Sequence, residues 1–231
     1  MPSPTKREII KKYRSLLTKL NSDKKMVGIL RRKKIDSAYE VYIFSLILKA
    51  VKNISDDNKI KFRGIKSDPT KKIIFRGSPG KIHSTRYNYG YAEFTYLEKT
   101  YEVHLDILYT GTSKVQHEID ISIIDKESAN NARNKLENPN TRGLRVAFEC
   151  KFYDKLEIHL IRTFIGLLDD MGQVNFACFL SNNKSDSIKQ YCTGKKNRPF
   201  FFPLVTPLEP DFEIKFVNFI EVYIQKAFGR A

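Results

Sequence analysis

Alternation of hydrophobic and polar positions predicts two strands near the middle of the chain. In residues 146–153, every second side chain is apolar, and in an extended strand these side chains share one face. They are Val146, Phe148, Cys150 and Phe152. Residues 117–124 repeat the pattern with Ile119, Ile121 and Ile123, opposite Glu118 and Asp120. A third strand around residues 103–108 is expected to form a hairpin with the second through residues 111–113.

Hydrophobic residues at three- and four-residue spacing predict helices in residues 9–20, 37–51, 156–168 and 211–228. A buried strand is expected at 174–180, and a short helix at 186–191. Strands and helices therefore mix along the chain. The predicted fold class is α/β, with a mixed central sheet flanked by helices and a basic N-terminal extension.

Charged side chains stand on the two otherwise hydrophobic central strands. Glu149 and Lys151 project side by side from the strand at 146–153, and Asp120 belongs to the neighbouring apolar segment. A carboxylate and an ammonium within hydrophobic strands are costly unless they pair or serve a metal site. An exposed strand face with a simple ion pair is the alternative, and it would contribute little energy.

An acidic residue on one strand, followed by Glu149-Cys150-Lys151 on the next, resembles the PD-(D/E)xK nuclease superfamily, which includes many restriction enzymes. The order strand, helix, strand after Lys151 is similar to the Mrr-type branch, and the resemblance covers about residues 100–192. Ile119 stands where the family has proline. Residues 125–142 would be an insertion between the two strands.

The resemblance implies a restriction-endonuclease-like fold and Mg²⁺-dependent hydrolysis of DNA, with Mn²⁺ able to substitute. Asp120, Glu149 and the Cys150 backbone carbonyl would bind the metal, and Lys151 would be the catalytic lysine. Mg²⁺ prefers such hard oxygen ligands and keeps several waters. A restriction or phage-defence endonuclease is the expected role. A nuclease-like protein that binds nucleic acid without cutting, and an RNA-directed nuclease, are the alternatives.

The accessory acidic residues have two interpretations each. Glu118 is a candidate accessory ligand, and Asp106 could replace Asp120 as the first ligand, although either could be a solvated strand acid. Glu40 could face the metal site, because the superfamily often places a glutamate on its first core helix. Ser37 and Glu40 also stand at capping-box spacing, which would explain Glu40 without catalysis. Thr5 and Glu8 have that spacing too.

Positive charge is concentrated in two blocks, within a formal net charge of +15. Residues 1–34 contain twelve Lys or Arg against two acids, and residues 61–91 contain eight against Asp68. Clustered positive charge is typical of proteins that bind polyanions, since phosphate neutralisation releases counterions. The candidate nucleic-acid contacts are Arg31, Arg32, Lys33, Lys34, Arg63, Arg76, Lys81, Arg86, Lys195 and Lys196.

Other chemistries have little support in the sequence. Cys150, Cys178 and Cys192 form no Cys-x-x-Cys pair, so neither a zinc site nor a disulfide framework is expected. Residues 1–34 are expected to be a basic helical extension and 35–231 a nuclease domain, with a catalytic core at about 100–192, a basic insertion at about 59–91 and a C-terminal helix at about 211–228. We expect a cytoplasmic protein that binds double-stranded DNA and no membrane, with a homodimer through the C-terminal helix as an open alternative.

Overall fold

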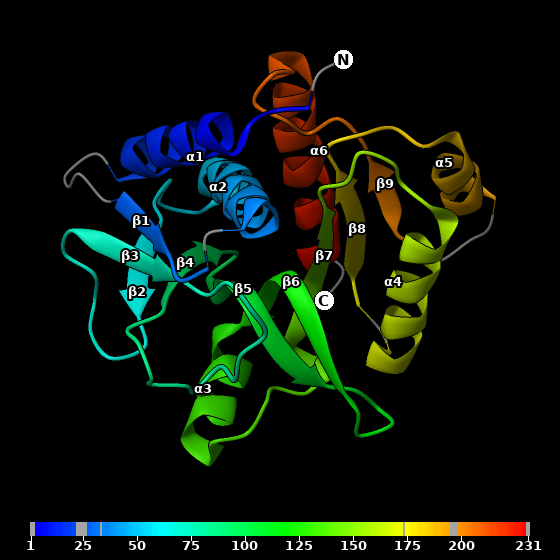
Figure 1. Ribbon diagram of the computed structural model, residues 1–231. Helices are drawn as coiled ribbons and strands as arrows, with labels where there is room; N and C mark the ends of the chain where they lie inside the picture. Colours follow the sequence, from blue (N-terminus) through cyan, green and yellow to red (C-terminus); the bar gives the residue numbers. More distant parts are fainter. Residues whose placement is uncertain (1–2, 22–26, 33, 173, 195–197, 230–231) are drawn as a thin grey trace.

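The computed structural model describes residues 3–21, 27–32, 34–172, 174–194 and 198–229 (Figure 1). Lys33, Lys195 and Lys196, three candidate nucleic-acid contacts, lie outside these ranges. The helices are α1 Lys6–Leu20, α2 Ile35–Ile54, α3 Lys126–Lys135, α4 Ile158–Met171, α5 Asp186–Thr193 and α6 Pro210–Phe228, with a 3₁₀ turn at Thr141–Gly143. The strands are β1 Val27–Leu30, β2 Lys61–Gly64, β3 Lys72–Phe75, β4 Gly90–Tyr96, β5 Lys99–Thr110, β6 Gln116–Asp125, β7 Leu144–Lys151, β8 Phe176–Ser181 and β9 Phe200–Phe202.

The central sheet has seven strands in the order β2-β4-β5-β6-β7-β8-β9. Pairing is antiparallel from β2 to β7 and parallel from β7 to β9, so the expectation of a mixed sheet is confirmed. The predicted hairpin of β5 and β6 is present, and α3 occupies the segment expected as an insertion between β6 and β7. A separate two-stranded parallel sheet joins β1 to β3.

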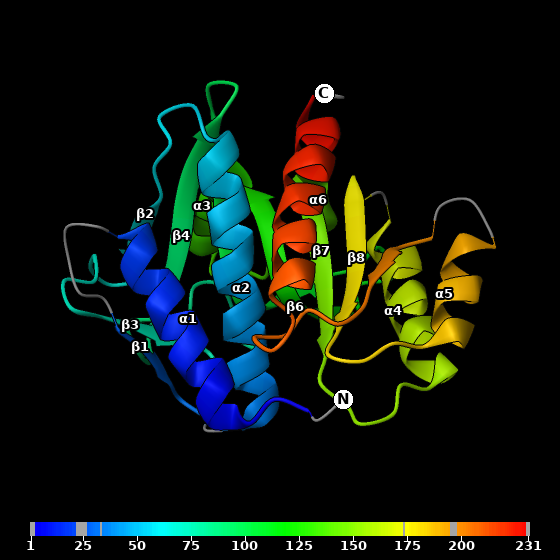
Figure 2. The ribbon, with the colours of Figure 1, turned by 90° about the horizontal axis from the view of Figure 1, so that it is seen from above.

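Helices cover both faces of this sheet, and a hydrophobic core lies under each layer. Figure 2 shows α1, α2 and α6 on one face and α3, α4 and α5 on the other. The first core contains Ile9, Tyr13 and Leu17 of α1 together with α2, α6 and the sheet, so the N-terminal helix shares the main core. In α6, Phe216 and Ile220 are buried in the same core, which accounts for most of the apolar stripe of this helix without a second copy of the chain.

The start of α2 differs from the capping prediction. The helix begins at Ile35 with Lys34 as its N-cap, and no side chain makes a cap hydrogen bond there. Ser37 lies inside the first turn, so the proposed Ser37–Glu40 capping box is wrong. The corresponding box at Thr5 and Glu8 is confirmed, because the two residues exchange the expected hydrogen bonds. Glu40 therefore has no capping role, and its position needs another explanation.

Strand alternation breaks where β5 passes β6. Ile119 packs in the core under α3 to α5, whereas Ile121 packs in the core under α1, α2 and α6. The expectation that Ile119, Ile121 and Ile123 share one face is therefore wrong. Asp106 of β5 has a φ of 50°, a left-handed conformation, and lies between the register pairs Leu105–Ile121 and Ile107–Ile119. Leu105 and Ile107 also point into different cores, so both strands change faces at this point.

Candidate active site

A cavity of about 260 Å³ opens between the N-terminal end of α2, the segment 77–79, the middle of β5 and β6 and the end of β7. It is lined by residues from all of these elements: Arg32, Lys34, Asp36, Ser37, Glu40, Gly77, Ser78, Pro79, Asp106, Glu118, Asp120, Cys150, Lys151, Phe152 and Tyr153. Seven residues predicted from the sequence are among them: Arg32, Lys34, Glu40, Glu118, Asp120, Cys150 and Lys151. Of the six residues predicted as catalytic, accessory or metal ligands, five therefore line one cavity, and Glu149 is the sixth.

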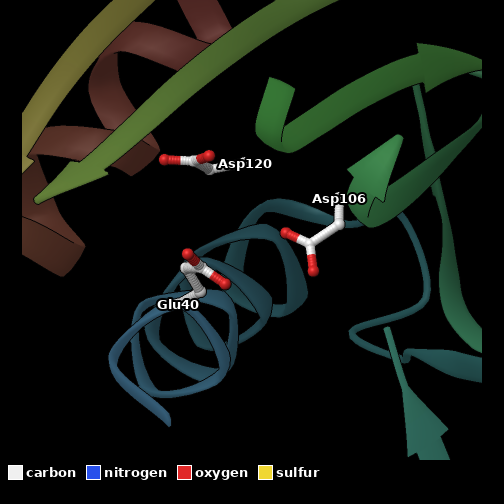
Figure 3. Close-up of side chains that lie close together, drawn as sticks. All are labelled: Glu40, Asp106 and Asp120. Atoms are coloured by element: carbon white, nitrogen blue, oxygen red, sulfur yellow. The ribbon is translucent and has the colours of Figure 1, made fainter. Parts of the chain in front are cut away.

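Three carboxylates converge in this cavity. Glu40 comes from α2, Asp106 from β5 and Asp120 from β6, and one oxygen of each lies within 4.8 Å of the others (Figure 3). Asp106 and Asp120 are almost completely buried, at 2% and 8% exposure. Within the described part of the chain, Asp106 makes no ion pair with a basic side chain. The left-handed backbone of Asp106 and the inward face of α2 together create this arrangement.

Asp120 also connects this trio to the end of β7. Its Oδ2 accepts a hydrogen bond of 2.7 Å from the backbone N–H of Cys150 and lies 3.7 Å from Nζ of Lys151. Lys151 forms a close ion pair with Glu149. Asp120, Glu149 and Lys151 therefore lie together, as the sequence pattern predicts, while Cys150 and Phe152 turn into the core on the other face. Glu149 contacts the lysine and is not part of the carboxylate trio.

The acidic groups hold their protons strongly because they are buried together. Burial first, and then the charges of Asp106, Asp120 and Glu118, raise the pKa of Glu40 to about 10. Burial followed by the Asp120 charge raises the pKa of Asp106 well above its usual range. The same two causes raise the pKa of Glu149 to about 8, although Lys151 opposes the rise. The pKa of Glu118 rises to about 7.

Lys151 remains a cation in this environment. Burial disfavours its ammonium, but the Asp120 and Glu149 carboxylates outweigh that effect and raise its pKa above the ordinary value. A permanently charged lysine can orient a water molecule or neutralise charge on a phosphoryl oxygen. One lysine cannot balance Glu40, Asp106, Glu118, Asp120 and Glu149 if all five are ionised.

A divalent cation fits this imbalance. The trio offers hard oxygen atoms from three carboxylates, the ligand type that Mg²⁺ prefers. A positive ion there would lower the pKa of each carboxyl group, because it favours the charged form. Glu40, Asp106 and Asp120 would hold such an ion, and Glu149 and the Cys150 carbonyl are the further ligands that the resemblance implies.

Two of the predicted basic contacts line the cavity, and two other arginines meet at Tyr87. Arg32 and Lys34 line the cavity directly and are exposed. The Arg31 guanidinium stacks 3.8 Å above the ring of Tyr87, and Arg86 approaches the same ring at 5.7 Å. Two arginines from distant segments therefore converge on one tyrosine. Such a surface suits the phosphates of a nucleic acid, because each phosphate can accept hydrogen bonds from more than one guanidinium.

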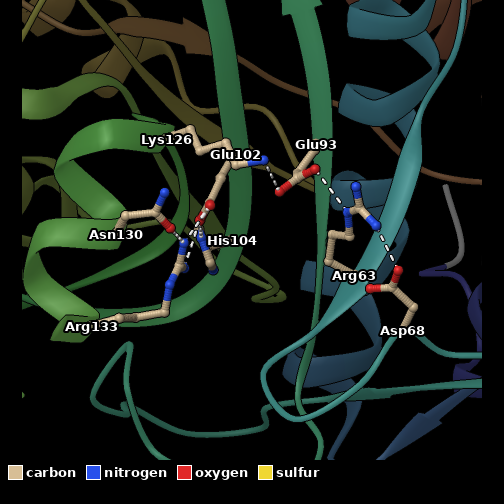
Figure 4. A network of polar contacts seen from close by, with 8 residues as sticks. All are labelled: Arg63, Asp68, Glu93, Glu102, His104, Lys126, Asn130 and Arg133. Atoms are coloured by element: carbon tan, nitrogen blue, oxygen red, sulfur yellow. Dashed lines mark hydrogen bonds and ion pairs between the residues drawn. The ribbon is translucent and has the colours of Figure 1, made fainter.

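Arg63 and Lys81, two other predicted nucleic-acid contacts, are less available to a substrate at this cavity. Arg63 donates to Glu93 at 2.8 Å and to Asp68 at 2.5 Å, within a network that also contains Lys126, Glu102, His104 and Arg133 (Figure 4). The charge of Arg63 is therefore neutralised by carboxylates of the protein itself. Lys81 lines a different cavity, with His83 and Lys114. Of the arginines in the basic segment, Arg86 is exposed and Arg76 is buried.

Asp106 is the main site residue that sequence reasoning ranked too low. Its place in the trio depends on a left-handed backbone conformation, which the neighbouring sequence does not predict. Comparison of the chain with family models, with curated proteins and with solved structures gave no match. No helix in the described ranges has both the length and the apolar character needed to cross a membrane. The likeness to PD-(D/E)xK nucleases therefore remains a resemblance based on residues.

Proposed function

We propose that this protein is a Mg²⁺-dependent nuclease that hydrolyses phosphodiester bonds in double-stranded DNA. The observation that supports the proposal best is the trio of the half-buried Glu40 and the buried Asp106 and Asp120 beside the cationic Lys151. A buried excess of carboxylates next to a lysine suits a cation and a phosphate. An isolated surface ion pair would require none of these features.

The residues would divide the chemistry between them. Asp120, Glu40 and Asp106 would hold the metal, with Glu149 and the Cys150 carbonyl as the further ligands that the sequence pattern predicts. A bound Mg²⁺ would stabilise negative charge on the phosphoryl oxygens. Lys151 would orient the attacking water and neutralise charge in the transition state, and Glu149 would hold the lysine in position through their ion pair.

The basic rim would bind the substrate without reading its sequence. Arg32 and Lys34 line the cavity and Arg31 precedes them in the chain, and contacts of this kind fix the position of a nucleic acid through its phosphates. A restriction or phage-defence role in the cytoplasm is consistent with these features and forms part of the proposal.

Incubation of the purified protein with plasmid DNA and with an RNA transcript, in Mg²⁺, in Mn²⁺ and in EDTA, tests the function. We expect cleavage of DNA in either metal and none in EDTA, and no cleavage by Asp120→Asn. Cleavage of RNA alone would change the substrate class. Tight DNA binding without cleavage in either metal would identify a binding protein with a nuclease-like core.

A further inference from the structure

Arg76 is a buried arginine without a hydrogen-bonding partner. Only 7% of the residue is exposed. Among the described residues, it forms no hydrogen bond, and no carboxylate lies within 4.0 Å of its guanidinium. A guanidinium has five N–H donors, and the Arg76 nitrogens are not among the fully enclosed unpartnered atoms of the described residues, so these donors remain within reach of a bound molecule. The fold therefore maintains a charged donor group that nothing in the described protein satisfies.

The surroundings of Arg76 hold the guanidinium in one place. It lies 4.1 Å from the centre of the Tyr89 ring, in a cation–π contact. A Cβ atom at Gly80 would lie only 2.7 Å from its Nη1, so glycine leaves the space that the guanidinium occupies. Packing thus fixes the side chain in position. A guanidinium that is already ordered loses less conformational entropy when it binds an anion.

The same contacts place Arg76 next to the carboxylate trio. Gly80 donates its backbone N–H to the carbonyl oxygen of Asp106 at 2.9 Å, and residues 77–79, which directly follow Arg76, line the cavity. Burial lowers the pKa of Arg76 to about 10, and the partial compensation comes from Tyr89 and Asp106. The Asp106 charge therefore acts on the guanidinium although the two groups are too far apart to form an ion pair.

We propose that Arg76 donates hydrogen bonds to one backbone phosphate of a nucleic acid bound over the carboxylate trio. This inference rests on the proposed function, since it assigns Arg76 to the substrate of that site. A planar guanidinium matches two phosphate oxygens, and the missing partners of Arg76 would then be supplied by the substrate. The trio attracts the cation and Arg76 attracts the anion, so the two features are complementary.

The alternative is that Arg76 is a structural counter-ion for Asp106, and the two readings predict opposite effects on stability. If the guanidinium is a binding group for phosphate, Arg76→Met removes an unpaired buried charge. Without phosphate, the variant should then melt at the same temperature as the parent protein or higher. If it is a counter-ion, the substitution should lower the melting temperature clearly. Arg76→Lys keeps the charge without the planar fork and serves as a second variant. Arg7→Met, at an exposed position on α1, is the matched control.

The decisive measurement uses DNA duplexes in which a single phosphate is replaced by a neutral methylphosphonate, moved one position at a time. Binding is measured in EDTA, where no cleavage is expected. For the parent protein and Arg7→Met, neutralising the phosphate that Arg76 contacts should weaken binding about tenfold, the size expected of one charge-assisted hydrogen bond. For Arg76→Met, that position alone should lose its effect. A parallel melting experiment compares inorganic phosphate with chloride at equal ionic strength, and Arg76→Met should lose the phosphate-specific gain.

The outcomes separate this inference from the proposed function. If the parent protein cuts DNA but Arg76→Met shows the same methylphosphonate pattern and the same phosphate gain, the role of Arg76 is overturned and the nuclease proposal stands. If the protein neither binds nor cuts nucleic acid, the proposed function falls, and with it the substrate role of Arg76. The melting comparison then decides whether Arg76 is an anion site at all. A clear loss of stability in Arg76→Met without phosphate also overturns the inference.

Discussion

Asp106 and Asp120 lie opposite one another on adjacent antiparallel strands, between the register pairs Leu105–Ile121 and Ile107–Ile119. Two ionised carboxylates at such positions would repel each other, and both are buried. Asp106 adopts a left-handed conformation that aspartate tolerates better than most residues. Backbone strain and like-charge proximity at the same point are typical of a functional site.

The carboxylate trio predicts which substitutions abolish metal binding. Stabilisation by Mg²⁺, measured as a rise in melting temperature, should be absent in Asp120→Asn and strongly reduced in Glu40→Gln and Asp106→Asn. Asparagine also tolerates the left-handed backbone at position 106, so the fold should persist. Glu149→Gln should retain more of the metal effect, because Glu149 contacts Lys151 and not the trio. If Glu149→Gln abolished the effect and Glu40→Gln did not, the metal would lie between Asp120 and Glu149.

Lys151 should be needed for chemistry and dispensable for binding. Lys151→Ala should reduce the cleavage rate by about 100-fold or more, the loss seen when one charged or hydrogen-bonding group leaves a transition state. DNA affinity should change little, because one charge among many is removed. Lys155→Ala, at an exposed position close in sequence, is the matched control and should cut normally. Single-turnover cleavage and DNA binding are measured for both variants, and equal cleavage rates would contradict the catalytic role.

The raised pKa values predict that the metal-free protein loses stability as the pH increases. The pKa of Glu40 is about 10 in the folded protein against an ordinary 4.5, so the folded state holds this proton more tightly than the unfolded chain. The contribution is complete below about pH 4.5 and is lost progressively as the pH rises toward 10. Glu149 adds the same trend up to about pH 8.

Melting temperatures in EDTA between pH 5 and pH 9 test this prediction. Glu40→Gln should flatten the decline and should be more stable than the parent protein at pH 8 to 9. Glu157→Gln, at an exposed position at the start of α4, should follow the parent curve. Parallel curves for Glu40→Gln and the parent protein would show that Glu40 is not protonated in the metal-free fold.

The basic cluster at residues 31–34 should control affinity and its salt dependence. Neutralising Arg31, Arg32, Lys33 and Lys34 together should weaken DNA binding for all sequences alike. Each lost phosphate contact should reduce the slope of log affinity against log salt by about one. Cleavage at saturating DNA should survive, since none of the four belongs to the carboxylate trio.

A matched control removes the same charge from a surface away from the cavity. Four exposed basic residues of α1 are available for it: Arg7, Lys11, Arg14 and Lys19. Neutralising these four should leave the salt slope nearly unchanged. Equal slopes for both fourfold variants would mean that the cluster at residues 31–34 acts only through net charge.

Local patterns in the sequence predicted five of the helices, the strands β5 to β8, and the Glu149-Cys150-Lys151 arrangement on β7. The alternation in residues 146–153 depends only on the two-residue period of a strand, so it places Cys150 in the core and Glu149 and Lys151 on the other face. The apolar stripes of α1, α4 and α6 are equally local signals, and they gave the α/β class and a mixed sheet. Asp120 was preferred as the first ligand because the resemblance places an acid within an apolar strand ahead of Glu149-Cys150-Lys151.

Which other carboxylates lie beside Asp120 depends on tertiary contacts. Glu40 and Asp106 reach it because α2 packs over the sheet and because β5 and β6 change faces together, and neither event leaves a local pattern in the chain. The capping interpretation of Glu40 failed because the helix begins at Ile35, three residues earlier than a Ser37 N-cap requires. The arginines also differ in their partners: Arg63 pairs with two carboxylates, and Arg76 pairs with none among the described residues. Charge can be counted in a sequence, but whether it is neutralised depends on contacts between segments that only the folded chain brings together.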